Sequence, residues 1–145
     1  MKPRTIIVTG LAATFPVGGV FWDYAQYLLG FLRMGHDAYY LEDSGGWTFD
    51  PRKNTYTDNA EFSAGYLAEH MRRLGPELEG RWCLRDTHDN HWGLSREAMQ
   101  AVVDRADVFI NISATCQLRE EYRKIPVKAL IDSDPLYTQT LSLIH

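Results

Sequence analysis

Apolar and polar positions along the chain follow two patterns, one typical of buried strands and one typical of amphipathic helices. Residues 5–9 (TIIVT) are a β-branched run without polar alternation, which predicts a strand buried on both faces of a parallel sheet. Residues 20–34 are mostly apolar, and Gly35 follows them where a left-handed helix cap is expected. The few exceptions in this helix fall on one narrow stripe, namely Asp23, Gln26, Gly30 and Arg33.

The same two patterns continue to the end of the chain. Further helices are expected over residues 62–74, from Ser95 to about Arg105, and over 116–124, and further strands over 38–42, 107–113 and 127–132, with a weaker one at 81–86. Residues 43–60 and the stretch RDTHDNHW are expected to be loops. This alternation predicts an α/β fold, a Rossmann-like three-layer αβα sandwich with a mostly parallel, doubly wound sheet.

Length and composition narrow the class of protein. A chain of 145 residues fits one domain, 1–145, with a core of its own. The net charge of −4 gives no electrostatic reason to expect nucleic acid as a partner. No apolar run reaches the roughly 18 residues that a membrane span requires. Two cysteines form no disulfide framework, so the expected location is the cytoplasm.

Gly18 and Gly19 stand where the first strand should lead into the first helix, and Val20 follows them. Bare glycines there let a phosphate or a sugar approach the backbone, and free amides at a helix start can bind an anion. The alternative is a tight turn that needs glycine torsions. Neither GxxxxGK[ST] nor the GxGxxG spacing of dinucleotide folds is present.

The stretch FPVGGV, the helix ending in RMGHD and the strand after it resemble the N-terminal domain of GT-B glycosyltransferases. The later stretches GLS, ADVFINIS and ALIDSDPLYTQ are similar to those of bacterial proteins of the same type. The resemblance implies two Rossmann-like domains facing each other across a cleft, with the acceptor on the N-terminal one and a nucleotide-sugar as co-substrate. It also implies that Gly18, Gly19 and Val20 lie at this cleft, close to the donor diphosphate or the transferred sugar.

A second domain of that kind would need roughly another 150 residues. We therefore expect the chain to be an acceptor-side half that cannot transfer sugar alone. Its apolar end, LYTQTLSLIH, is expected to pack against a donor domain or a second copy.

Acidic and aromatic residues at two strand ends are candidates for the chemistry. Asp132 and Asp134 follow the last strand, where two close carboxylates can share a proton, hold a cation or form an ordinary turn before proline. Glu42 and Asp43 end the second strand and could bind acceptor hydroxyls. Trp47, like Phe49 after it, could stack on an acceptor or be a half-buried loop aromatic.

The stretch RDTHDNHW holds His88 and His91, of which His91 is the candidate general base. The two histidines have a spacing that suits a metal, but no third ligand is evident, so we expect no metal site. Three other interpretations of the function stay open. The chain could be a non-catalytic Rossmann-like binding module, a metal-dependent domain like those of GT-A enzymes, or a nicotinamide nucleotide-binding domain.

Overall fold

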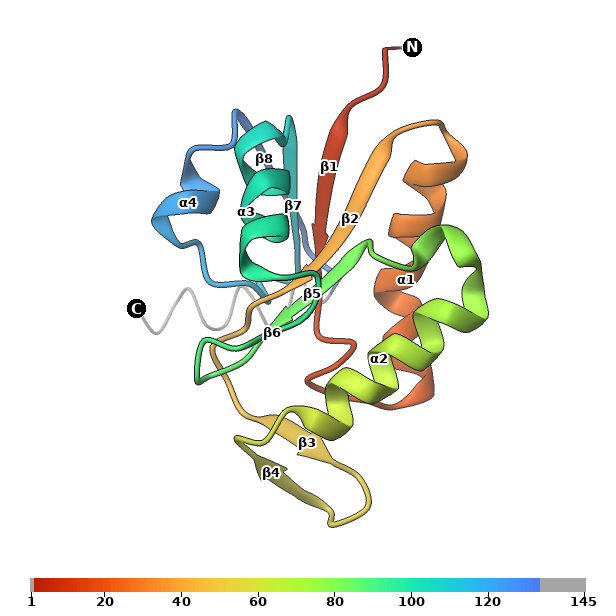
Figure 1. Cartoon of the computed structure of the whole chain (residues 1–145), viewed down its shortest axis with the longest axis vertical. Helices are drawn as coiled ribbons and strands as arrows, with labels where there is room; N and C mark the ends of the chain where they lie inside the picture. The colour runs from red at the N-terminus through yellow and green to blue at the C-terminus, as the bar shows by residue number, and fades with distance from the viewer. Residues whose placement is uncertain (1, 134–145) are drawn as a thin grey trace.

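The computed structural model describes residues 2–133, and the elements keep the predicted order (Figure 1). One sheet has the strand order β6-β5-β2-β1-β7-β8, and a separate pair is formed by β3 and β4. The elements are β1 (Thr5–Thr9), α1 (Gly18–Arg33), β2 (Asp37–Glu42), β3 (Thr48–Asp50), β4 (Thr55–Thr57), α2 (Glu61–Leu74), the 3-10 helix η1 (Pro76–Leu78), β5 (Trp82–Arg85), β6 (His91–Gly93), α3 (Arg96–Arg105), β7 (Val108–Ile112), α4 (Glu120–Arg123) and β8 (Val127–Ile131).

The large sheet is mostly parallel, as the apolar runs predict. Strands β1, β2, β5, β7 and β8 pair in parallel, and only β6 runs antiparallel, beside β5. Because β2 lies on one side of β1 and β7 on the other, the chain reverses its direction of winding between β1 and β7. The predicted mixed α/β class with a mostly parallel sheet is confirmed.

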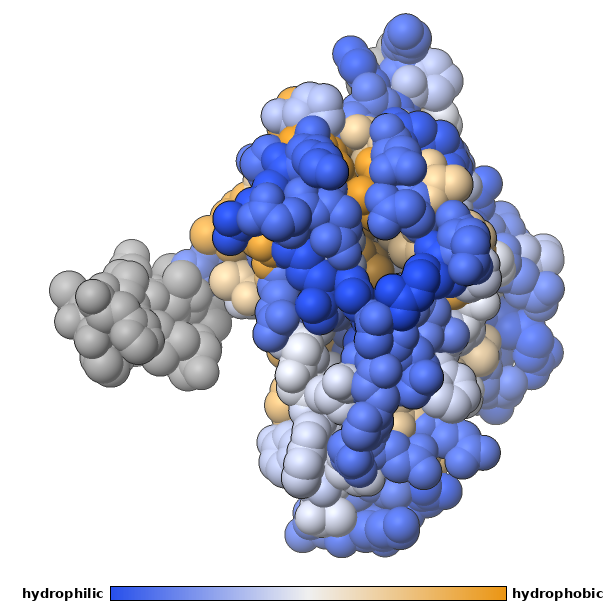
Figure 2. Space-filling view, turned by 60° about the vertical axis from the view of Figure 1, so that its left-hand side comes forward, coloured by the Kyte–Doolittle hydropathy of each residue, from blue (hydrophilic) through white to orange (hydrophobic). Residues whose placement is uncertain are grey.

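Helices lie on both sides of the sheet, with α1 and α2 on one face and α3 and α4 on the other (Figure 1). Successive residues of β1 show why, since Ile6 and Val8 pack toward α1 and α2 while Ile7 packs toward α3. A strand that alternates between two covered faces has no polar side, which explains the unbroken TIIVT run. Figure 2 views the face of α3 and α4, where apolar side chains appear between hydrophilic ones.

Several local predictions are confirmed. Gly35 has a φ of 83° and follows α1, as the left-handed cap requires. Ser95 caps α3 with its side chain, whose hydroxyl accepts a hydrogen bond from the amide of Ala98 at 3.1 Å.

Other local predictions are wrong. Residues 43–60 and RDTHDNHW, both expected to be loops, contain the β3–β4 hairpin and the start of strand β6. The sequence pattern does not reveal these strands, because short antiparallel pairs carry almost no periodic signal. The helix expected over 116–124 shrinks to α4 (Glu120–Arg123), since the preceding residues are held by side chains of other elements. Gly18 and Gly19 are the first two residues of α1 itself, not a loop ahead of it.

Candidate functional site

The carboxyl ends of five parallel strands meet at one edge of the sheet, which points toward the β3–β4 hairpin in Figure 1. In open α/β sheets a ligand binds outside this edge, at the point where the winding reverses. Here that point lies between the loop after β1 and the loop after β7. We therefore take the loops at this edge as the candidate site.

Glu42, at the end of β2, holds the loop between β1 and α1. Its Oε1 accepts hydrogen bonds from the amide and the hydroxyl of Thr14, at 2.5 and 2.6 Å. Its Oε2 accepts from the amide of Ala13 at 2.9 Å and from the hydroxyl of Tyr40 at 2.7 Å. The carboxylate is fully buried, and both oxygens are engaged by its own chain.

Burial raises the pKa of Glu42 above its ordinary value, and the four donors oppose this rise. No lysine, arginine or histidine donates to this carboxylate in any of these four bonds. Its structural role is therefore to fix the path of residues 12–14. Binding of acceptor hydroxyls by Glu42, as the sequence suggests, stays a prediction that would require these internal bonds to open.

Helix α1 begins at Gly18 and Gly19, just after the loop that Glu42 fixes, and it has no side-chain cap. Val17 at the N-cap position makes no side-chain hydrogen bond to the helix. Gly18 and Gly19 are exposed, have no positive φ, and leave open space where a Cβ would stand. The tight-turn alternative is therefore wrong, and an uncapped helix start with bare backbone remains at the edge of the sheet.

The glycine that packing does require is Gly10, directly after β1. A Cβ at this position would overlap the ring of Tyr24 in α1. This contact lets α1 lie close to the end of β1. The sequence does not reveal this requirement, because the close approach of a ring from another element leaves no local signal.

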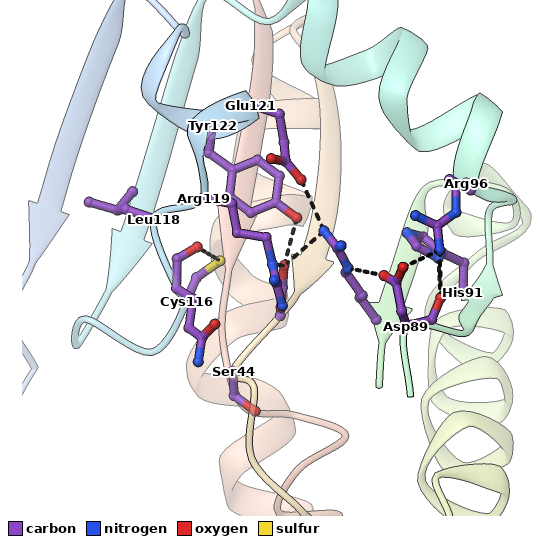
Figure 3. Close-up of polar contacts among 12 residues, drawn as sticks. Ser44, Asp89, His91, Arg96, Cys116, Leu118, Arg119, Glu121 and Tyr122 are labelled. Carbon is purple, nitrogen blue, oxygen red and sulfur yellow. Dashed lines mark hydrogen bonds and ion pairs between the residues drawn. The ribbon is translucent and has the colours of Figure 1, made fainter. Parts of the chain in front are cut away.

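Asp43, next to Glu42, is the centre of a charged network, and its partners Arg119 and Tyr122 are labelled in Figure 3. It is fully buried and accepts two hydrogen bonds from Arg119, at 2.6 and 2.8 Å, and one from the hydroxyl of Tyr122 at 2.7 Å. Arg85 lies 3.6 Å from the same carboxylate and donates to Glu121 at 2.9 Å. Burial and the charge of Asp43 raise the pKa of Tyr122 well above its ordinary value, so its hydroxyl stays protonated.

This network joins β2 and β5 to the segment before α4. Arg85 and Arg119 were not singled out from the sequence, and only the fold brings them to Asp43. A bidentate arginine on a buried carboxylate is a strong, geometrically specific pair. Binding of an acceptor by Asp43 therefore stays a prediction, and the contacts that the structure shows are internal.

The loop after β7 has a strained backbone. Ser113 and Ala114 have φ values of 53° and 54°, in the left-handed region that non-glycine residues rarely adopt. The side chain of Asn111 donates to the carbonyl of Cys116 and accepts from its amide, both at 3.1 Å. Such strain is found at binding and catalytic sites, and here it lies where the winding of the sheet reverses.

The candidate catalytic residues His91 and Asp132 lie far apart in the fold. His91 begins β6 and Asp132 follows β8, so they lie at opposite edges of the sheet with four strands between them. Burial and then the charge of Arg96 lower the pKa of His91, which favours a neutral imidazole. Asp134 lies outside the described residues. His91 and Asp132 therefore cannot act on one bond within this fold.

His91 lines a hollow of about 240 Å³ between β6, α3 and α4. Arg85, Arg96 and Glu121 form part of its rim, and Met99 and Val103 add apolar surface. Asp89 links two of these arginines, accepting from Arg96 at 2.5 Å and from Arg85 at 2.6 Å (Figure 3). The charges of the rim are thus already paired with each other.

The remaining candidates differ in exposure. Trp47 precedes β3 and is 58% exposed, so it is available to a ligand. The Cys116 thiol is buried, and burial raises its pKa, which makes it a poor nucleophile. Among residues 2–133 no group of three or more possible metal ligands occurs, and no helix there is long and apolar enough to cross a membrane.

Comparisons with known proteins find no match. No family model, no curated protein and no solved structure matches the chain.

Proposed function

We propose that the chain is a doubly wound, Rossmann-like three-layer domain and the acceptor-side half of a GT-B glycosyltransferase. Its partner half would bind a nucleotide-sugar, and the reaction would transfer the sugar to an acceptor hydroxyl. The observation that carries this proposal is the uncapped start of α1 at Gly18 and Gly19, which follows a loop that Glu42 fixes at the sheet edge. At this helix start the amides of Val17 and Val20 donate to main-chain carbonyls, at 2.7 and 3.1 Å, so those of Gly18 and Gly19 are the ones that suit a phosphate or a sugar hydroxyl.

A second function is favoured by the internal pairing at the site. Glu42 and Asp43 are occupied by their own chain, and His91 and Asp132 are far apart. The separation of these candidate bases within residues 2–133 is consistent with a non-catalytic binding module that uses the same edge. The two functions share the ligand contact at α1 and differ in whether glycosyl transfer occurs once a donor domain is supplied.

Amide NMR on the 145-residue chain tests the ligand contact. Titration with uridine diphosphate and UDP-glucose is expected to shift the amides of Gly18, Gly19 and Val20, with a Kd in the millimolar range. Gly19→Gln is expected to weaken this binding at least tenfold. Gly65→Gln is the matched control, because Gly65 is another exposed helical glycine with open space at its Cβ.

Two outcomes would contradict the proposal. One is the absence of shifts at residues 18–20 with the fold intact. The other is micromolar nucleotide binding centred elsewhere, which would place the donor site inside this chain. Transfer of a sugar by the 145-residue chain alone would overturn the assignment as an acceptor-side half.

A further inference from the structure

Two large aromatic side chains are left exposed beside the candidate site, on the β3–β4 hairpin. Trp47 is 58% exposed and Tyr56 is 53% exposed. Tyr56 pairs with Phe49 in the register of the hairpin, and Trp47 lies two residues before Phe49. Because paired residues of a ladder share a face, Phe49 and Tyr56 lie on one face of the hairpin, and Trp47, just before β3, stands two residues from Phe49 in the same alternation. We call this set the hairpin aromatic face.

The ring of Tyr56 is held in place by two other rings. Its centroid lies 5.5 Å from that of Phe49 at an interplanar angle of 63°, and 6.1 Å from that of Phe15 at 88°. Both contacts are edge-type, so neither neighbour stacks flat on Tyr56, and more than half of the side chain stays open. An ordered ring that remains exposed is ready to stack on a ligand.

The hairpin is itself fixed to the candidate site. The amide of Phe49 donates to the carbonyl of Thr14 at 2.8 Å, and the amide and hydroxyl of Thr14 donate to Glu42. Phe15 is the next residue, and α1 begins at Gly18 three residues later. The opposite face of β3 is covered, with Thr48 and Asp50 buried. The aromatic side of the hairpin contacts Phe15, three residues before the uncapped start of α1.

The size of the face suits a small ligand better than a protein. With up to about 250 Å² for a whole aromatic side chain, the exposed fractions leave roughly 250 Å² on Trp47 and Tyr56 together. A stable protein interface needs about 800 Å² from each partner. The area matches one or two sugar rings, whose faces carry C–H groups and whose edges carry hydroxyls.

We infer that the hairpin aromatic face binds the pyranose rings of a carbohydrate acceptor by stacking on Trp47 and Tyr56. This inference rests on the proposed function for the identity of its ligand. Thr55 and Thr57 flank Tyr56 on β4 and, by the same alternation, belong to the opposite face of the hairpin, with Asp50 and Thr48. The hairpin aromatic face thus offers rings for the apolar side of a sugar.

Saccharides without a nucleotide test this inference. The probes are lactose, maltotriose, chitotriose and mannotriose. Their binding is monitored by amide and indole NMR of the 145-residue chain. At least one probe is expected to shift the Trp47 indole and the Tyr56 amide. Trp47→Ala and Tyr56→Ala should raise its Kd at least fivefold, whereas Tyr56→Phe should stay within twofold of wild type because it keeps the ring.

Leu130→Ala is the matched control, because Leu130 is 57% exposed at the opposite side of the sheet on β8. Its Kd should also stay within twofold, and circular dichroism checks that each variant folds. Absence of shifts with all four saccharides overturns the inference, as does binding that ignores both alanine variants. Shifts at Trp47 with uridine diphosphate but with no saccharide would assign the face to a nucleobase and also overturn it.

The two proposals fail separately. Saccharide binding at Trp47 and Tyr56 without nucleotide shifts at residues 18–20 supports the aromatic face and removes the support for the proposed function. Nucleotide shifts at residues 18–20 without saccharide binding support the proposed function and overturn the inference about the aromatic face.

Discussion

Replacing Glu42 by glutamine should destabilise the protein, although the two side chains have nearly the same shape. Glutamine offers one oxygen acceptor and one NH₂ donor where Glu42 offers two oxygens. The NH₂ group would face either the Ala13 amide and the Tyr40 hydroxyl or the amide and hydroxyl of Thr14. A hydroxyl can rotate to accept, but a main-chain N–H cannot, so one buried amide loses its partner.

The size of the effect follows from these contacts. An unsatisfied buried amide costs about 1–3 kcal/mol, and the remaining bonds lose about 1 kcal/mol when their acceptor becomes neutral. Removing a buried charge offsets part of this loss, since burial already raises the pKa of Glu42. We expect Glu42→Gln to lower the free energy of unfolding by about 2 kcal/mol.

Urea denaturation followed by circular dichroism and tryptophan fluorescence measures this change. Glu61→Gln is the matched control, because Glu61 is exposed in the first turn of α2 and should change stability by less than about 0.5 kcal/mol. Equal stability of Glu42→Gln and the control would refute the role of Glu42 in fixing the loop. A loss of stability without faster amide exchange at residues 13 and 14 would show that the effect arises elsewhere.

Three further predictions concern the backbone and the charges. Ala114→Gly should raise the free energy of unfolding by about 1 kcal/mol, because glycine relieves the positive φ, and an unchanged or lower urea midpoint would argue against strain there. Gly10→Ala should lower the free energy of unfolding by about 1–3 kcal/mol, because the added Cβ would overlap the Tyr24 ring. Gly30→Ala is the control and should raise the free energy of unfolding by about 0.5–1 kcal/mol, because there is open space at Gly30. Equal effects of the two substitutions would refute the packing argument. The hydrogen bond from Arg96 lowers the pKa of Asp89 to about 2, so as the pH falls the unfolded chain binds this proton before the folded chain does. Wild type should therefore lose stability between about pH 4 and 2, and Asp89→Asn should not show this loss. Parallel pH profiles of the two proteins would contradict this prediction.

The sequence predicts the fold best where one element is buried on a long, regular face. The β1 run, the apolar α1 and the Ser95 cap each carry a local pattern with a physical cause, and each is found where it is expected. The β3–β4 hairpin was missed because strands of three residues are too short for a period-2 signal to emerge from a polar loop. Length of the element, not its importance, decided what could be predicted.

The sequence indicates where the candidate site would lie but not which contacts its residues make. Strand ends and an early glycine pair indicate the edge of a parallel sheet from local sequence alone. The partners of Asp43 lie 76 and 79 residues away, in Arg119 and Tyr122. No pattern in one sequence indicates such pairs, because the tertiary fold alone sets their distance.

The internal pairing at this edge bears on how the site would work. The two carboxylates at the end of β2 differ in their partners, since Glu42 takes only neutral donors and Asp43 takes the guanidinium of Arg119. Each holds a different segment, residues 12–14 in one case and residues 117–122 in the other, so β2 fixes both sides of the point where the winding reverses. In the proposed function, this frame would leave ligand contacts to the bare start of α1 and the exposed rings of the hairpin. A base acting on a bound acceptor would then be a group other than Glu42 and Asp43, whose oxygens are occupied by their own chain.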